Sequence, residues 1–262
     1  MAEQATVIRF RTTGREKLSF WIADKLDELM FLTGSGRAYT LKLDGSTRTS
    51  SQLPSLSFGA DVVAASTNRI VHAGSATSEA TLTTSDKMSW QVIVNAKTKA
   101  GRKKLRPIRE GGKEYFAIVI SSEQRRDLVL DPTYQTILRS AEKQGSNNPL
   151  FTGAIAVVDG VIIHSHNKVY NTFGLVSGVG KWGAGSTVDG AQALMFGAQA
   201  LGLATLGNLF YRESDKTDYG NRPGIGIGRK FGILKPQFLS LPDGGAREDF
   251  GVISVKTAAA AA

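Results

Sequence analysis

The chain has 262 residues and carries 32 lysine and arginine residues against 23 acidic residues, a formal net charge of +9. This length is sufficient for one large domain or two modest domains with a buried core. Because the sequence contains no cysteine, disulfide frameworks and thiolate metal sites are excluded. The first residues lack an apolar core of signal-peptide length, so we expect a cytoplasmic protein.

The first predicted element is an amphipathic helix. Apolar residues recur at steps of three and four from Leu18 to Leu32, with charged residues between them. We expect this helix to end near Gly34, because glycine commonly follows the last helical turn.

A low-charge segment, residues 37–85, separates this helix from the next. Its topology is not evident from the sequence, although Asp44-Gly45 predicts a hairpin-type turn within it. A second helix is expected to begin after Ser85, as its amino-terminal cap, and to stop at Gly101.

The centre of the sequence gives the clearest local signals. Residues 113–121 form a compact apolar, β-rich run, and the four residues 121–124 fit a capping box that opens a short helix. A further helix is predicted with Asp131 as its cap, Pro132 in its first position and Gly145 as its stop.

Strands dominate the remaining sequence. Two β-branched runs flank Asp159-Gly160, a dipeptide that strongly favours a two-residue hairpin turn. Further strands are expected at residues 208–214, 224–233, 235–241 and 250–255.

An uncharged stretch, residues 190–207, contains the pentapeptide GAQAL twice, seven residues apart. Ser186 and Asp189 resemble a capping box, so we predict a helix that runs from Asp189 to about Gly207. Its glutamines and glycines contribute little favourable free energy of transfer into lipid, which argues against a membrane span. A helix with small or apolar residues on every side is expected to be buried in protein.

A basic cluster is the sharpest concentration of charge, and no acid interrupts it. Two interpretations stay open: a solvated loop or inter-subunit contact, and a contact with nucleic-acid phosphates. No aromatic residue lies between the cations, so a base-stacking platform is not expected. The cluster comprises Lys97, Lys99, Arg102, Lys103, Lys104, Arg106 and Arg109.

The sequence offers no catalytic constellation and no cofactor motif, so we expect neither an enzyme nor a bound cofactor. His164 and His166 are two residues apart on a predicted strand and point the same way, as two metal ligands would. Since no third ligand is nearby in the sequence, a metal-dependent enzyme is the weakest alternative.

Several blocks resemble, in the same order, the N-four-type phage major capsid proteins. The central block is residues 115–169, which begins YFAIVISSEQ, and the carboxyl-terminal third contributes ALMFGAQAL, DYGNRPGIGIG, KFGILKPQF and DFGVISVKTAAA. Residues 18–36, LSFWIADKLDELMFLTGSG, resemble the helix that precedes the family's axial domain. The resemblance therefore extends over about residues 15–259.

This resemblance implies an α+β fold of the Hong Kong 97 type, with mixed sheets, a spine helix and a buried axial-domain helix at residues 189–206. Residues 1–121 are then expected to be peripheral-domain-like and residues 122–262 axial-domain-like, with strands that return to the peripheral domain. The family's usual N-terminal arm and extended loop are expected to be absent, which places autonomous shell assembly in question.

The function that the resemblance implies is structural. Pentamers and hexamers of the chain would form an icosahedral shell around packaged double-stranded DNA, in the host bacterial cytoplasm and then in the virion. Scaffolding, decoration or portal proteins would be partners, and no membrane would be involved. The alternative is a basic nucleic-acid-binding protein that uses residues 97–109.

Overall fold

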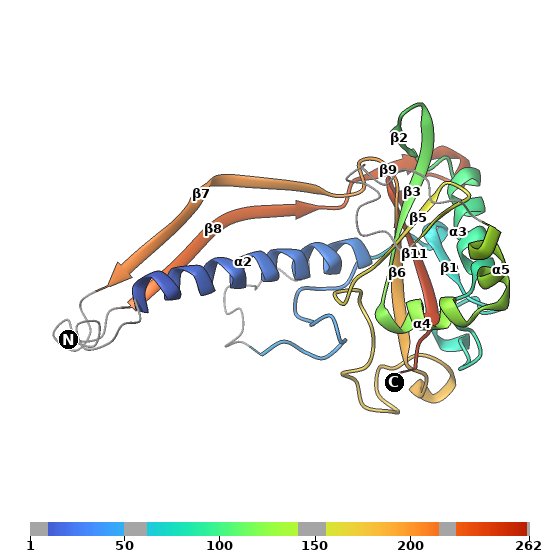
Figure 1. The fold of residues 1–262 in the computed structure, drawn as a ribbon, viewed down its shortest axis with the longest axis horizontal. Helices are drawn as coiled ribbons and strands as arrows, with labels where there is room; N and C mark the ends of the chain where they lie inside the picture. The colour runs from blue at the N-terminus through green and yellow to red at the C-terminus, as the bar shows by residue number, and fades with distance from the viewer. Residues whose placement is uncertain (1–9, 50–61, 141–155, 215–223, 261–262) are drawn as a thin grey trace. The chain divides into compact units, whose positions relative to one another are not determined.

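The computed structural model describes residues 10–49, 62–140, 156–214 and 224–260. The chain forms two compact units that interleave along the sequence (Figure 1). One unit combines Met1–Met30 with Leu203–Leu234, and the other combines Phe31–Gly202 with Lys235–Ala262. Residue 121, at which a domain boundary was expected, lies inside the second unit, between strand β3 and helix α4.

The second unit is built around a mixed sheet of seven strands. Along the sheet the order is β1-β11-β6-β3-β5-β4, and β2 pairs with β3 as a short hairpin. The pairs β1–β11 and β3–β5 are parallel, and the other pairs are antiparallel. These strands are β1 (Ile70–His72), β2 (Ile108–Glu110), β3 (Lys113–Ile120), β4 (Ala156–Val158), β5 (Val161–Ser165), β6 (Gly190–Phe196) and β11 (Val252–Ala258).

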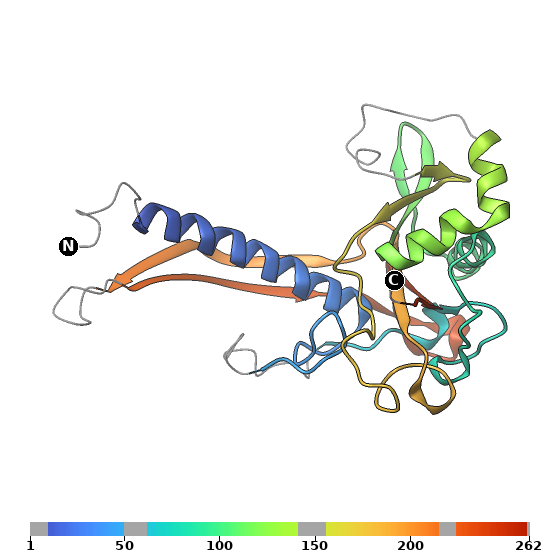
Figure 2. The same ribbon diagram turned by 60° about the horizontal axis from the view of Figure 1, so that its bottom comes forward.

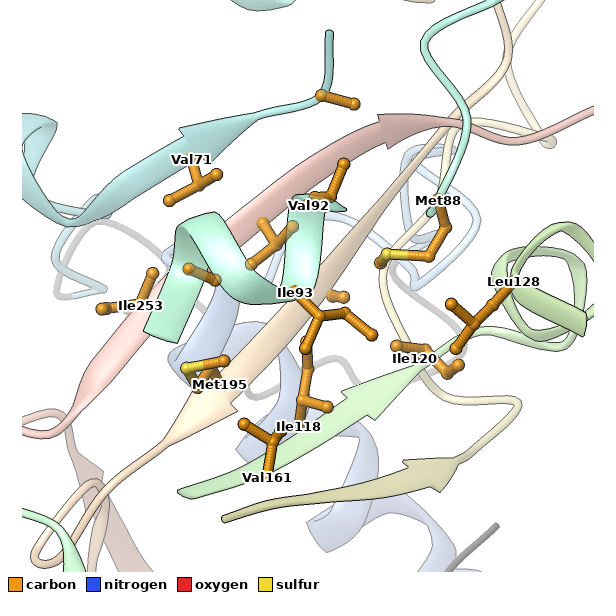
Figure 3. Close-up of a cluster of buried hydrophobic side chains, with 14 of the residues drawn as sticks. Val71, Met88, Val92, Ile93, Ile118, Ile120, Leu128, Val161, Met195 and Ile253 are labelled. Atoms are coloured by element: carbon orange, nitrogen blue, oxygen red, sulfur yellow. The ribbon is translucent and has the colours of Figure 1, made fainter. Parts of the chain in front are cut away.

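In the described part of this unit, three helices pack on one face of the sheet. Alternate strand residues such as Ile118, Met195 and Ile253 point to the same buried cluster as Ile93 of α3 and Leu128 of α4 (Figure 3). This alternation is what period-two strands produce when one face is packed against helices. The helices are α3 (Trp90–Arg102), α4 (Ser122–Leu130) and α5 (Pro132–Ser140), of which α4 and α5 contact each other (Figure 2).

The predicted helix caps of the central block are confirmed. Ser121 Oγ accepts a hydrogen bond from Gln124 N at 3.1 Å, and Gln124 Oε1 accepts one from Ser121 N, so the capping box is complete. Asp131 Oδ1 accepts from Thr133 N at 3.1 Å at the start of α5. The expected stop at Gly145 lies outside the described residues.

The second predicted helix forms, but it begins later than expected. Helix α3 is capped at Ser89 rather than at Ser85, because residues 83–86 form a tight turn in which Asp86 accepts hydrogen bonds from Thr83. The hairpin turn at Asp159-Gly160 is confirmed, and both residues have positive φ, 49° and 67°. Asp44-Gly45 also forms a turn, which is closed by an isolated bridge between Leu41 and Thr47.

The predicted helix over residues 189–207 is wrong. The first GAQAL belongs to β6, a strand buried on both faces between β11 and β3, and the second GAQAL forms the connection to β7 (Gly202–Ser214). Ser186, the expected cap, lies in a 3₁₀ turn, Ala184–Ser186, with φ of 55°. A central strand buried on both faces has the same continuous apolar composition as a buried helix, which explains the error.

The described residues of the first unit form a long helix and a two-stranded ribbon. Helix α2 (Phe10–Ser35) ends close to the predicted Gly34, and its last residues belong to the second unit. The ribbon pairs β7 with β8 (Gly224–Leu234), and both strands were predicted, although β7 begins before the expected residue 208. Among the described helices, none is long and apolar enough to cross a membrane.

Among its described residues, the second unit also has a second small ribbon and four short 3₁₀ helices. The ribbon pairs β9 (Gln237–Ser240) antiparallel with β10 (Ala246–Asp249), which confirms the strand expected at residues 235–241. The 3₁₀ helices are η2 (Thr67–Arg69), η3 (Glu79–Thr81), η4 (Ala184–Ser186) and η6 (Leu241–Asp243).

Candidate assembly surfaces and a basic cluster

In the first unit, side chains of α2 are bound to the ribbon of β7 and β8. Arg15 forms an ion pair with Glu213, and its guanidinium lies 6.0 Å from the ring centroid of Tyr211. Ser19 and Tyr211 share a hydrogen bond between their hydroxyl groups. These contacts hold one face of the helix to the ribbon.

The first unit also exposes several large apolar side chains. Phe20 and Leu206 are each 74% exposed, and Leu234 is 63% exposed. Contiguous exposed apolar surface on a soluble protein usually marks a contact with a partner. The exposed large apolar residues of this unit are Phe20, Trp21, Leu203, Leu206, Phe210, Tyr211 and Leu234.

The basic cluster predicted from the sequence lies in the second unit, at the end of α3 and in the connection to β3. The seven cations are not arranged as one exposed run. Lys97, Lys99 and Arg102 lie on α3, Lys103 is its carboxyl-terminal cap, Lys104 and Arg106 lie in the connection, and Arg109 lies on β2.

Three of these cations pair with carboxylates. Lys97 Nζ lies 2.7 Å from Asp159 Oδ1 in the β4–β5 turn, and Lys103 Nζ forms an ion pair with Asp243. Arg109 pairs with Glu114 across the β2–β3 hairpin at 2.9 Å, but both side chains are more than half exposed, so solvent screens this pair strongly. These three residues therefore have structural partners within the subunit.

The other cations are more available. Arg102, Lys104 and Arg106 are exposed, and no carboxylate of the described residues forms an ion pair with them. Lys99 Nζ donates a hydrogen bond to the carbonyl oxygen of Ile70. Burial lowers the pKa of Lys99, and the neighbouring Lys103 lowers it further.

Three of the cations come together around one hollow. Lys99, Arg102 and Lys103 line a cavity of about 650 Å³ between α3, η2 and β1. The opposite wall of the cavity was not predicted from the sequence. It includes Asn68 and His72, which belong to the low-charge segment 37–85 whose topology was not evident. Neither residue carries a local sequence signal, because the parallel pairing of β1 with β11 brings this wall into place.

A buried arginine that sequence reasoning also missed anchors the end of α3. Arg69, which is 1% exposed, donates from Nη2 to the carbonyl oxygen of Lys103 at 2.9 Å. A cation at the carboxyl end of a helix interacts favourably with the helix dipole and with the last carbonyl groups. Arg69 therefore fixes the helix end that carries the cations of the hollow.

The two histidines considered as metal ligands do not converge with further ligands in the described part of the chain. No group of three or more histidine, aspartate or glutamate residues suited to a metal ion occurs among the described residues. The ring of His166 stacks on Phe31, with centroids 5.1 Å apart, and its Nδ1 accepts a hydrogen bond from Lys168 N. His166 thus has a packing role.

Comparison with known proteins identifies relatives over nearly the whole chain. A family model described as phage capsid protein matches residues 1–261. A major capsid protein of Pseudomonas phage KPP25 is 42% identical over 269 residues, which covers 99% of this chain and 70% of the relative.

Solved structures agree with this result. The capsid of Ralstonia phage GP4 is similar with a TM-score of 0.78 at 28% identity, over 98% of this chain and 70% of that chain. The cyanophage Pam1 capsid asymmetric unit shares the fold with a TM-score of 0.68 at 17% identity, over 98% of this chain and 71% of that chain.

Proposed function

Since this chain belongs to the phage capsid protein family, we propose that its copies assemble through pentamers and hexamers into an icosahedral shell around double-stranded DNA. The chain is a structural major capsid protein of the Hong Kong 97 type and not an enzyme. The observation that carries this conclusion is the 42% identity to a major capsid protein over 99% of the chain.

The two units suggest how the subunit is divided. We assign the unit of α2 and the β7–β8 ribbon to the peripheral domain, with α2 as the spine helix, and the unit of the seven-stranded sheet to the axial domain. The 26-residue length of α2 and the long strands of the ribbon support this assignment. The chain would then enter the peripheral domain twice.

The exposed apolar residues of the first unit are the inter-subunit contacts in this proposal. Leu206 and Phe20, each 74% exposed, contribute little to the stability of an isolated subunit, whereas full burial of either side chain contributes about 1.5–3 kcal/mol. Repetition of modest contacts around a closed shell makes them collectively strong.

Contact with packaged DNA would use the available cations of the basic cluster. Arg102, Lys104 and Arg106 are exposed, as required for neutralisation of backbone phosphates without reading of base sequence. Lys97, Lys103 and Arg109 have carboxylate partners and would contribute less. The stand-alone nucleic-acid-binding alternative has no support among the relatives.

We place assembly in the host bacterial cytoplasm, with which a cysteine-free chain is compatible. Scaffolding, decoration and portal proteins are the further partners that we propose, and co-purification of the assembled particles would identify them.

Electron microscopy of the purified protein, combined with light scattering, tests the proposal. We expect closed shells, or pentamers and hexamers, at raised protein concentration. A protein that stays monomeric under all assembly conditions, and that binds DNA tightly in this state, would instead support the nucleic-acid-binding alternative.

A further inference from the structure

The hollow beside α3 has a chemical character that shell formation does not require. Its volume of about 650 Å³ falls within the usual range of small-ligand sites. Three cations and several neutral hydrogen-bond donors line it, and no carboxylate is among its lining residues in the described part of the chain. The polar residues on which the argument rests are Asn68, His72, Asn95, Lys99, Arg102 and Lys103.

The nearby carboxylates neutralise only part of the positive charge of the hollow. Asp243 accepts from Lys103 and from Ser240, and Glu248 accepts from Asn68 Nδ2 at 2.7 Å. Lys99 and Arg102 form no ion pair with the described carboxylates. Burial lowers the pKa of Lys99, and the like charges of Lys103, Arg102 and Arg69 also lower it, against the opposing effect of Glu248. A bound anion would offset this mutual repulsion.

The cations project from a rigid support. Ala96 and Ala100 of α3 are fully buried in the core, and Arg69 binds the carbonyl oxygen of the helix cap. Lys99 Nζ is held against the Ile70 carbonyl oxygen, beside the other wall of the hollow. Ligand binding therefore loses less side-chain entropy here than at mobile surface lysines.

We propose that this hollow binds a phosphate group, with Lys99 and Arg102 as its principal ligands and with Asn68 and Asn95 as neutral donors. A guanidinium and an ammonium with flanking amide donors match the several acceptor oxygens of a phosphate. The group can come from free phosphate or from the backbone of a nucleic acid. The site belongs to the second unit alone, so it does not depend on shell assembly.

Isothermal titration calorimetry of the full chain with inorganic phosphate and with pyrophosphate tests the site. We expect saturable binding that weakens at least about tenfold in Lys99→Gln and in Arg102→Gln. Arg106→Gln is the matched control, because it removes an equal charge from the connection that follows α3, outside the hollow. We expect its phosphate affinity to change by less than about twofold.

The same variants distinguish the two sources of phosphate. If the hollow takes a backbone phosphate, Arg102→Gln will weaken binding of a short DNA duplex more than Arg106→Gln does. If it takes free phosphate, both variants will weaken duplex binding equally, while the difference in phosphate binding persists. Either outcome supports the site.

Three results would overturn the proposal. They are the absence of saturable phosphate binding, equal losses of phosphate affinity in all three variants, and displacement of phosphate by equimolar acetate or glutamate, which would indicate a carboxylate site. Thermal unfolding of each variant checks its fold, and phosphate should raise the melting temperature of the native chain but not that of Arg102→Gln. Normal shells together with absent phosphate binding would refute the site while leaving the capsid function intact.

Discussion

Arg69 is a fully buried cation, and its ion-pair partner is the buried carboxylate of Glu248. Its Nε lies 3.9 Å from Glu248 Oε2, and the two side chains are 1% and 2% exposed. Its guanidinium also lies 5.6 Å from the ring centroid of Phe238. Removal of one member of such a pair leaves the other charge buried without compensation, which costs far more than the pair contributes.

We therefore predict that Arg69→Met destabilises the protein by about 3–5 kcal/mol, because Glu248 would be left buried and charged. Denaturant unfolding of the variant measures this loss. Arg247→Met is the control, since Arg247 is exposed and precedes Glu248 on β10. The double variant Arg69→Met, Glu248→Gln should recover part of the stability, and a single variant as stable as the control would contradict the prediction.

His72 makes stability depend on pH. Burial lowers the pKa of His72 below its ordinary value near 6.5, and Lys256 and Lys99 lower it further, against the opposing charge of Glu79. Arg37 and Lys256 both form ion pairs with Glu79, so these two cations already neutralise the charge of this carboxylate. The folded protein consequently keeps this imidazole neutral at a pH at which the unfolded chain protonates it.

The unfolded chain then binds more protons, so stability contributed by His72 is present above the unfolded pKa and is lost as the pH falls from about 6.5 towards the folded pKa. We expect His72→Gln to flatten this part of the pH profile in phosphate-free denaturant titrations. An unchanged profile in His72→Gln would assign the dependence to another group.

At the scale of elements, Gly190 shows how closely β6 is packed. A Cβ atom at this position would lie 1.9 Å from Trp182 Cε3, so any side chain displaces the buried indole. We predict that Gly190→Ala costs about 1–3 kcal/mol and changes the tryptophan fluorescence. Gly101→Ala, which meets nothing within 4 Å, should keep or raise the stability. Equal stability of the two variants would contradict this packing.

The same strand shows what the sequence could predict. Glycine is required at position 197 as well, since a Cβ there would lie 2.4 Å from the Arg106 carbonyl oxygen. The expected helix is wrong, because the pairing of β6 with β11 and β3 is non-local and overrides the apparent capping signal. Caps and turns at Gln124, Asp131 and Asp159 depend on neighbouring residues only, and these predictions succeeded.

The basic cluster was predictable as charge but not as a site. A run of cations is visible in the sequence, yet the carboxylates that neutralise Lys97 and Lys103 lie at positions 159 and 243. The wall that completes the hollow is contributed by residues 67–77, whose strand pairs with the carboxyl-terminal strand. Partners so far apart in the sequence cannot be recognised from neighbouring residues. Only the fold shows that Lys97 has a carboxylate partner and that Arg102 has none among the described residues.

At the scale of the whole molecule, both units expose large apolar side chains, but only the second unit combines them with a large buried core. That core surrounds one sheet, while Leu130 and Leu241 of the same unit are 66% and 80% exposed. The first unit keeps Phe20, Leu206 and Leu234 largely exposed. Contact with other copies of the chain, which we propose for this surface, would bury these side chains.

We therefore predict that Leu206→Asp and Phe20→Asp abolish shell assembly while the isolated subunit stays folded. Each change removes about 1.5–3 kcal/mol of burial per contact and places a charge in a dry interface, and every subunit of the shell suffers the same loss. Electron microscopy measures assembly, and circular dichroism with thermal unfolding checks the subunit. Leu130→Asp is the matched control, because Leu130 is 66% exposed in the second unit. Intact shells from Leu206→Asp, with assembly lost in Leu130→Asp, would place the decisive contacts on the second unit instead.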